Sequence, residues 1–307
     1  MPGRVFLTGG TGFVGSAVID ELITHGFDVS ALVRDKLPEQ KDRIHVVKGD
    51  LFDTAGLESM IRGCAAVIHL VGIIRENPQK KVTFERIHFE GTKSIVDATI
   101  RAGVKRYIHM SALGTRCDAA SDYHRTKYLA EQYIRASGLD WTILRPSLIH
   151  GEKGEFMQMA AKWARRQAAP FLFMPYFGSG ITGFGGAAKV QPVFVKDVAR
   201  AFVDAVGNPK TIGEVYLLAG NDQMTWPQMY RTVSRAVVGK QRLTAPIPAW
   251  YAKMLTKVIP ASLLPFNADQ VDMSQEDNIA DIAKFVNDFG FSPQAFESSL
   301  QSYASSL

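Results

Sequence analysis

The chain has 307 residues; 46% of them are hydrophobic, 21% are charged, and the formal net charge is +5. These values are typical of a soluble globular protein with one large α/β domain, or with such a domain and a smaller lobe. No apolar run reaches the roughly 18 residues that a membrane span needs. We therefore expect no transmembrane segment. Zinc-finger and RNA-binding signatures are missing, so we do not expect nucleic-acid binding either.

Cysteine and histidine usage indicates a reducing environment and no metal centre. Cys64 and Cys117 stand apart from any CxxC pair, which argues against a disulfide framework. The seven histidines show no HExxH or similar ligand spacing, so no metal site is predicted. The first predicted strand begins by residue 4, which leaves no room for a signal or transit peptide. We therefore expect a cytoplasmic protein.

Residues 4–16, RVFLTGGTGFVGS, combine a short apolar run, three glycines at a spacing of three residues, and the start of a helical pattern. Gly9 allows a sharp turn, Gly12 lets the backbone approach a pyrophosphate, and Gly15 lets the helix lie close to the strand. The helix N-terminus offers free N–H groups and a positive dipole end to the phosphates. This order of strand, turn and helix predicts a dinucleotide-binding fold; a tight turn that meets no ligand is the alternative.

Strand and helix patterns alternate through the first half of the chain, which predicts an α/β fold with a parallel sheet wrapped on both faces. Residues 1–150 should form a doubly wound Rossmann core that binds NAD(P). Residues 151–307 should form a smaller, mostly helical substrate or partner lobe, from which 190–220 returns to pack on the core. The expected strands are 4–8, 28–33, 44–48, 66–71, 105–110 and 140–145, and the expected helices are 13–25, 55–62, 82–102 and 122–137.

After residue 150 the pattern becomes less regular. The glycine-rich segment 177–189 predicts a mobile loop or lid. Thr225 is the expected N-cap of a helix over 225–238. The other expected elements are a helix over 153–168, a short strand leading into a helix over 191–206, a strand over 214–220, and a helical tail from 241 broken by Pro246, Pro248, Pro260 and Pro265.

The tip of the second strand predicts which nucleotide is bound. An acidic side chain at this tip selects NAD by binding the adenosine ribose, but the register places Val33 there. Arg34 follows, and its guanidinium can pair with a 2′-phosphate, which favours NADP(H). Asp35 would instead act as the ribose ligand and favour NAD(H) if the register were one step different. Asp50 and Leu51, after the third strand, could approach the adenine amino group or form a simple polar turn.

Three residues are candidates for catalysis. Ser111 follows the fifth strand at the carboxyl edge of the sheet, where open α/β folds bind ligands. Tyr123 and Lys127 lie four residues apart and therefore share one face of a helix. The ammonium can lower the pKa of the phenol and contact the nicotinamide ribose, Ser111 can hydrogen-bond a substrate carbonyl, and Tyr123 can supply a proton.

These motifs together resemble the short-chain dehydrogenase/reductase superfamily, in its extended or atypical branch. TGGTGFVG, GDLFD (49–53), HMSALG, YHRTK, LRPSLIHG (144–151) and QPVFVKDVA (191–199) match that branch in order, and the match covers essentially the whole chain. Within it, HLVGIIREN (69–77), the YHRTKYLAEQ helix and DQVDMSQEDN (269–278) are most similar to the nucleotide-binding accessory subunit of respiratory complex I and its bacterial relatives.

The resemblance implies a role for each matching residue. Ser111, Tyr123 and Lys127 match the catalytic serine–tyrosine–lysine group, and Tyr123 and Lys127 also match cofactor contacts. One departure is the bulky run from Ile73 to Glu76, where typical enzymes have small residues; it could fill the substrate pocket. The other implied cofactor contacts are Gly9, Thr11, Gly12, Phe13, Gly15, Arg34, Asp50, Leu51, Val71, Gly72 and Pro146.

Regulatory sensing of the NADP(H) ratio, which needs no catalytic group, is one function that the sequence leaves open, and two further functions remain open as well. One is an NADP(H)-binding protein that holds its nucleotide as a structural cofactor and associates with respiratory-complex subunits or a quinone pathway. The other is an NADPH-dependent reductase or epimerase that acts on a small or lipophilic carbonyl or hydroxyl substrate. The aromatic residues of 156–177 form either packing core or a lipophilic pocket. The helix expected within 247–266 either packs on its own lobe or lies on the inner face of a membrane.

Overall fold

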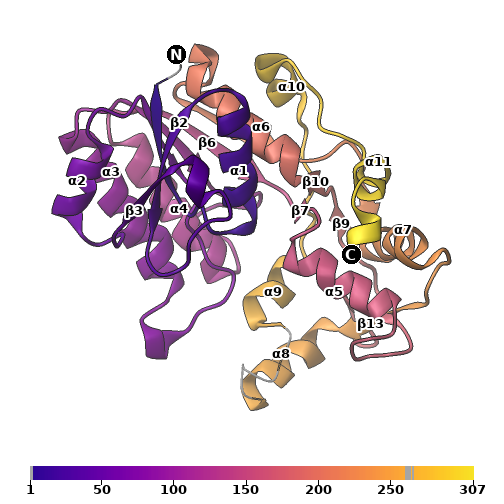
Figure 1. Ribbon diagram of the computed structural model, residues 1–307. Helices are drawn as coiled ribbons and strands as arrows, with labels where there is room; N and C mark the ends of the chain where they lie inside the picture. The colour runs from indigo at the N-terminus through magenta and orange to yellow at the C-terminus, as the bar shows by residue number, and fades with distance from the viewer. Residues whose placement is uncertain (1–2, 260–263, 265) are drawn as a thin grey trace. The chain divides into compact units, whose positions relative to one another are not determined.

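The computed structural model describes residues 3–259, 264 and 266–307, and the chain forms two compact units (Figure 1). Unit 1 comprises Met1–Pro146, Val195–Leu218 and Asp281–Phe291. Unit 2 comprises Ser147–Phe194, Ala219–Ala280 and Ser292–Leu307. The chain therefore passes from one unit to the other more than once.

Unit 1 contains a seven-stranded sheet of order β11-β6-β5-β4-β1-β2-β3 in which every neighbouring pair is parallel. The order reverses at β1, as in a doubly wound Rossmann fold, and this confirms the predicted α/β class. The strands are β1 (Arg4–Thr8), β2 (Asp28–Val33), β3 (His45–Lys48), β4 (Ala66–His69), β5 (Arg106–Met110), β6 (Asp140–Pro146) and β11 (Glu214–Leu218).

Helices cover the sheet of unit 1 on both faces. On one face α1 packs against α6, and on the other α3 contacts both α2 and α4. A core of fully buried residues, including Phe6, Val67 and Tyr107, lies beneath α2 and α3. The helices are α1 (Phe13–Thr24), α2 (Thr54–Ile61), α3 (Gly91–Arg101), α4 (Asp122–Arg135), α6 (Val195–Gly207) and α10 (Ala283–Phe289).

The expected elements of the first half are confirmed to within a few residues at their ends, with one exception. The stretch 82–102 was expected to be a single helix. It instead contains a π-helical segment, Glu85–Glu90, before α3 begins at Gly91. Such π-type turns are rare within helices and occur frequently at functional sites. This segment places Phe84 and His88 against Tyr123.

Unit 2 is built from short strand pairs and helices. The predicted N-cap is confirmed, because Thr225 and Gln228 form a reciprocal capping box at the start of α7. The helices are α5 (Glu155–Ala164), α7 (Trp226–Val238), α8 (Ala249–Val258), α9 (Ala268–Met273) and α11 (Phe296–Gln301). The strands are β7 (Ile149–His150), β8 (Met174–Gly178), β9 (Lys189–Val190), β10 (Val193–Phe194), β12 (Met224–Thr225) and β13 (Thr244–Pro248).

The prediction of a helical tail from residue 241, broken by prolines, was wrong over residues 244–248. Thr244–Pro248 forms β13, which pairs in parallel with β8. Proline is tolerated in this two-stranded sheet because an edge strand does not need every N–H group for its ladder. Pro246 and Pro248 therefore concealed a strand rather than interrupting a helix. Pro260 and Pro265, which were also expected to break the tail, lie outside the described residues.

Candidate functional site

The glycine loop joins β1 to α1 with the geometry expected of a phosphate cradle. Gly9 has a φ of +81°, in the left-handed region that favours glycine. A Cβ on Gly15 would overlap the carbonyl oxygen of Gly9 and lie 2.8 Å from the Cα of Gly10. The first turn of α1 can therefore approach the end of β1 only because residue 15 has no side chain.

The N-terminus of α1 is open to a ligand. Gly12 is the N-cap, and no side chain caps the helix there. Thr11 and Phe13 are partly exposed beside it. The first N–H groups of a helix lack partners within the helix, and the helix dipole makes this end attractive to anions. The residues present therefore fit the pyrophosphate of a dinucleotide.

The glycine loop lies against the end of β4. A Cβ on Gly9 would be 3.0 Å from the carbonyl carbon of Leu70 and 3.1 Å from the nitrogen of Val71. One residue further, a Cβ on Gly72 would be 3.4 Å from the Nζ atom of Lys127. The structure thus brings the predicted contacts Gly9, Val71, Gly72 and Lys127 to one edge of the sheet.

Arg34 and Asp35, the two candidates for selecting the nucleotide, pair with each other. β2 ends at Val33, which confirms the register used for the prediction. The Nε atom of Arg34 donates a hydrogen bond of 2.9 Å to Asp35, and the side chains are 69% and 82% exposed. Both groups are therefore free to rearrange around an adenosine ribose or its 2′-phosphate.

The adenine-pocket candidates form a tight turn after β3. The N–H group of Phe52 donates to the Asp50 carboxylate at 2.9 Å, and the hydroxyl of Ser94 donates to the carbonyl oxygen of Leu51 at 2.5 Å. The guanidinium of Arg86 lies 4.3 Å above the ring of Phe52. These contacts fix the turn against α3 and the segment before it.

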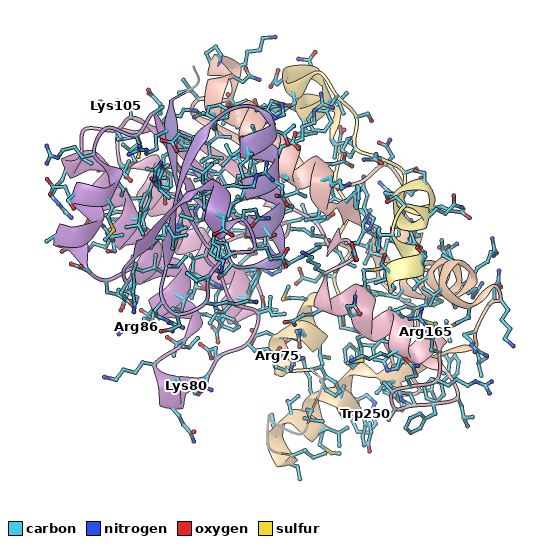
Figure 2. All side chains as sticks on the ribbon, in the orientation of Figure 1. Arg75, Lys80, Arg86, Lys105, Arg165 and Trp250 are labelled. Atoms are coloured by element: carbon cyan, nitrogen blue, oxygen red, sulfur yellow. The ribbon has the colours of Figure 1, made fainter. Side chains whose placement is uncertain are left out.

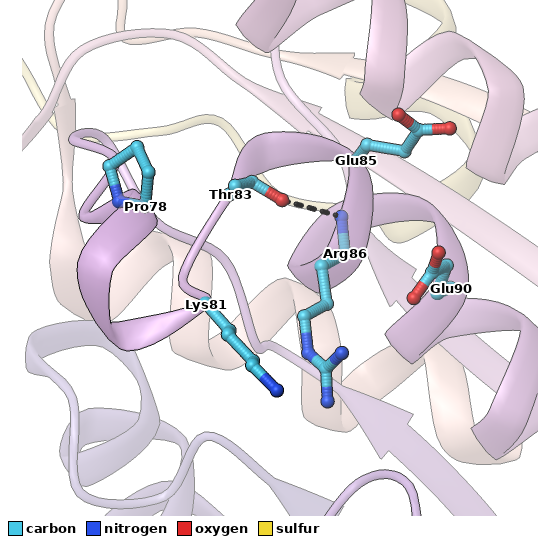
Figure 3. Close-up of a pocket in the computed structure, with 6 residues that line it drawn as sticks. All are labelled: Pro78, Lys81, Thr83, Glu85, Arg86 and Glu90. Carbon is cyan, nitrogen blue, oxygen red and sulfur yellow. Dashed lines mark hydrogen bonds between the residues drawn. The ribbon is translucent and has the colours of Figure 1, made fainter.

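A hollow of about 300 Å³ opens beside Arg86 (Figure 3). Its wall carries both signs of charge, and the hydroxyl oxygen of Thr83 accepts a hydrogen bond of 3.2 Å from the N–H group of Arg86. No predicted site residue lines it. The lining residues are Pro78, Lys81, Thr83, Glu85, Arg86 and Glu90.

Tyr123 and Lys127 lie on the first two turns of α4, which Ser121 caps by accepting a 3.3 Å hydrogen bond from the N–H group of His124. Lys127 is buried, its Nζ atom donates to the carbonyl oxygen of Met110 at 3.1 Å, and it lies 5.7 Å from the centre of the Tyr123 ring. The rings of Phe84 and His88 meet Tyr123 edge-on, at 5.8 and 5.2 Å between centres.

Burial sets the protonation of this pair. It lowers the pKa of Lys127 to about 8, an effect that the negative charge of Glu131 opposes. Burial also raises the pKa of Tyr123 well above its ordinary value. The sequence suggested that Lys127 would lower the pKa of the phenol, but burial raises this pKa instead. Near neutral pH the pair is therefore an ammonium beside an un-ionised phenol, which can donate a proton.

Ser111 belongs to a buried network that the sequence did not reveal. Its hydroxyl donates a 2.5 Å hydrogen bond to Glu131, which is itself fully buried. Arg145 binds both carboxylate oxygens of Glu131, at 2.8 and 2.6 Å. Because a hydroxyl has one proton, Ser111 offers acceptor lone pairs to other groups. The one sequence signal for this network was the position of Glu131 four residues after Lys127, which places both residues on the same face of α4.

His88 connects the end of β4 to α4. Its Nδ1 atom is 3.0 Å from the hydroxyl of Thr126, and its Nε2 atom is 3.1 Å from both the nitrogen and the oxygen of Ile73. Burial lowers the pKa of His88 to about 2, so the ring is neutral. The bulky segment that begins at Ile73 is thereby held beside Tyr123.

Pro146, at the end of β6, accepts a 2.9 Å hydrogen bond from the N–H group of Leu113.

A family model described as NAD(P)H-binding matches residues 9–162, which include the glycine loop and every candidate site residue described above. The match covers half of the chain. The chain belongs to this NAD(P)H-binding family. It is an NAD(P)-binding member of the atypical short-chain dehydrogenase/reductases, as the order of its motifs predicted.

Characterised relatives include both respiratory subunits and enzymes. The chain is 26% identical to the mitochondrial NADH-ubiquinone oxidoreductase 40 kDa subunit of Neurospora crassa, over 93% of this chain and 74% of that protein. It is 28% identical to the ceramide reductase of Caulobacter vibrioides, over 78% and 73%. The fold matches UDP-glucose 4-epimerase from Thermus thermophilus in complex with NAD, with a TM-score of 0.72, 20% identity and coverage of 98% and 97%.

The described residues contain neither a membrane-spanning helix nor a metal-binding cluster. No helix among residues 3–259, 264 and 266–307 is both long and apolar enough to cross a bilayer. No group of three or more histidine, cysteine, aspartate or glutamate side chains in the same ranges is placed to hold a metal ion.

Proposed function

We propose that this protein is an NADPH-dependent reductase of a lipophilic carbonyl compound, with Tyr123 as the proton donor. The observation that carries the proposal is the position of the buried Lys127 ammonium. It lies 5.7 Å from the centre of the Tyr123 ring and close to Gly72, at the edge of the sheet that carries the predicted cofactor contacts. A lysine with no function would not be expected at 3% exposure, because burial of a charge is costly. The name of the Caulobacter relative, ceramide reductase, supports a lipophilic carbonyl.

The chain's own residues would divide the work of holding NADP(H). The glycine loop and the N-terminus of α1 hold the pyrophosphate. Arg34 breaks its hydrogen bond with Asp35 and pairs with the 2′-phosphate instead. Lys127 orients the nicotinamide ribose. When bound, NADPH would supply the hydride that reduces the carbonyl carbon. Tyr123 donates its phenolic proton to the carbonyl oxygen, and its raised pKa keeps that proton in place until the oxygen becomes negative.

Ser111 would have a secondary role. Its proton is engaged with Glu131, so it cannot also donate to a substrate carbonyl. Ser111 instead accepts a hydrogen bond from a hydroxyl group and helps to orient the product alcohol. We therefore expect Ser111→Ala to lower turnover by less than about tenfold, whereas loss of the proton donor in Tyr123→Phe should cost about 10²–10⁴-fold.

Identification of the molecules that copurify with the protein tests the proposal. Gentle purification followed by mass spectrometry should recover NADP(H) in preference to NAD(H), together with an apolar carbonyl or alcohol. Arg34→Ser should weaken NADP(H) binding about tenfold and leave NAD(H) binding nearly unchanged. Asp35→Asn is the matched control, because it removes the competing partner of Arg34. If NAD(H) bound more tightly to the unmodified protein, the NADP(H) assignment would be wrong.

A nucleotide-holding subunit of a respiratory assembly is the second candidate. The similarity to the Neurospora subunit over 93% of this chain favours it. In this role the protein would be cytoplasmic, peripheral at the inner face of the membrane, and bound to respiratory-complex subunits. NADP(H) would remain bound without turnover. If Tyr123→Phe left the physiological function unaltered while Gly15→Ala abolished it, the subunit role would replace the reductase.

A further inference from the structure

Unit 2 exposes a cluster of large apolar side chains on α8 and on the loop between β8 and β9. Ile181 is 85% exposed, Phe184 is 77% exposed and Val258 is 75% exposed. Trp250 and Met254 are also exposed, and they lie eight and four residues before Val258 on one face of α8. We call these five residues the apolar patch. Large apolar side chains grouped in this way usually mark an interaction surface.

A hydrogen bond joins the two parts of the apolar patch. The indole Nε1 of Trp250 donates to the carbonyl oxygen of Ile181 at 2.9 Å, and Figure 2 shows Trp250 on α8. The loop and the helix therefore present one surface. The indole N–H group has a partner within the protein, so the ring can enter an apolar medium without loss of a hydrogen bond to water.

The sequence around the apolar patch is cationic. Residues 156–194 and 223–268 contain ten lysine and arginine residues and no aspartate or glutamate. They include α5 after its first residue, Glu155, together with β8, the β8–β9 loop, α7, β13 and α8. On α8 itself Lys253 and Lys257 flank the apolar stripe, and Lys253 pairs with Asp272 of α9. An apolar surface among cations is suited to an anionic partner.

We propose that the apolar patch and its surrounding cations dock the protein on an anionic lipid bilayer. Apolar side chains would enter the boundary between head groups and acyl chains while lysines contact the head groups. A second copy of this chain fits less well, because a symmetric interface would bring like charges together. The inference deepens the peripheral placement proposed above. It makes no use of the reductase activity.

Flotation of the full-length protein with lipid vesicles tests the proposal. We expect the protein to float with vesicles of equal parts phosphatidylcholine and phosphatidylglycerol, and not with phosphatidylcholine alone. Raised salt should weaken the association, because ions screen the attraction between lysines and head groups. NADPH turnover, measured separately, shows whether the reductase proposal holds, so that failure of one proposal is distinguishable from failure of the other.

Variants then locate the surface. The triple variant Ile181→Ser, Phe184→Ser, Val258→Ser should reduce vesicle partitioning about tenfold or more, because it removes apolar area that would be buried in lipid. The double variant Ile100→Ser, Leu129→Ser is the matched control, since each of these residues is 46% exposed on helices of unit 1. Unchanged nucleotide binding in both variants shows that the fold is intact.

Three results would overturn the proposal. The first is equal partitioning into neutral and anionic vesicles. The second is a triple variant that floats as well as the unmodified protein. The third is a protein that does not bind lipid vesicles but does bind native membranes, and that no longer binds those membranes after they are treated with protease. This result would make the partner a protein.

Discussion

The two units of this protein differ in where they place charged and apolar groups. Unit 1 buries ionisable side chains such as Lys127, Glu131 and His69 next to its candidate site. Unit 2 instead exposes large apolar side chains, and no large apolar side chain in the described part of unit 1 is more exposed than Leu37, at 51%. Buried charges adjust proton affinity, whereas exposed apolar groups attract partners. We therefore propose that unit 1 carries the chemistry and that unit 2 carries the docking surface.

Acid should destabilise unit 1 more than unit 2. Burial lowers the pKa of His69 to about 3 and of His88 to about 2, and it lowers that of His109 as well. In unit 2 the pKa of His150 is lowered to about 3. These rings stay neutral in the folded state, but below about pH 6.5 they gain protons when the chain unfolds. Each ring therefore lowers the free energy of unfolding by about 1.4 kcal/mol for each pH unit of acidification, until the pH reaches the pKa of the ring in the folded state.

Hydrogen exchange read out by mass spectrometry checks this prediction. As the pH falls below about 6.5, protection in β4 and β5 should decrease before protection in β7 and β10. His69→Gln should flatten the dependence for unit 1. The exposed His25→Gln is the control and should not change it. Simultaneous or reversed loss of protection would show that the buried histidines do not distinguish the units.

Gly15→Ala should have the next largest effect. The new Cβ overlaps the carbonyl oxygen of Gly9, so the glycine loop must shift, at about 1–3 kcal/mol. Nucleotide affinity should fall by roughly tenfold to 100-fold, as measured by calorimetric titration. Gly207→Ala, at the end of α6, is a control of similar chemistry with open space at its Cβ and no left-handed backbone, and it should leave affinity unchanged. Equal effects of the two changes would contradict the cradle geometry.

Lys127 should impose an alkaline limit on turnover. Because its pKa is lowered to about 8, the ammonium is present below that pH and is lost above it. The raised pKa of Tyr123 means that the phenol keeps its proton over the same range. The kcat/KM for carbonyl reduction should therefore fall about tenfold per pH unit above about pH 8. Lys127→Arg should shift this limit to higher pH, and a limit that stayed at the same pH would exclude Lys127 as its cause.

Thr225→Ala should have a small effect confined to unit 2. The change removes one half of the capping box on α7 and should cost about 1 kcal/mol of stability. Urea unfolding monitored by exchange in α7 measures the loss, and nucleotide affinity should be unchanged. Thr24→Ala, at the last residue of α1, is a control because its hydroxyl hydrogen-bonds within its own helix. A change in nucleotide affinity for Thr225→Ala would mean that the units are not independent in binding.

Unit 1 was largely predictable because its signals are local. The glycine spacing at Gly9–Gly15 and the apolar strands specify the Rossmann order, and the register that placed Val33 at the end of β2 is confirmed. The network of Ser111, Glu131 and Arg145 was not predicted, because it joins three elements whose meeting depends on tertiary packing. In unit 2 the prolines of β13 concealed a strand. Periodicity alone could not decide whether α8 packs on its own lobe or lies on a membrane, because the same apolar stripe would suit either surface.

The most direct test of the central claim is a single-turnover measurement of hydride transfer. The protein is loaded with NADPH and mixed rapidly with a lipophilic ketone or aldehyde, and loss of nicotinamide absorbance is followed. We predict fast oxidation by the unmodified protein and a rate about 10²–10⁴-fold lower in Tyr123→Phe, with equal NADPH affinity in both. Equal rates in the two proteins, or NADPH that stays reduced in both with every carbonyl tried, would contradict the assignment of catalysis to Tyr123 and Lys127.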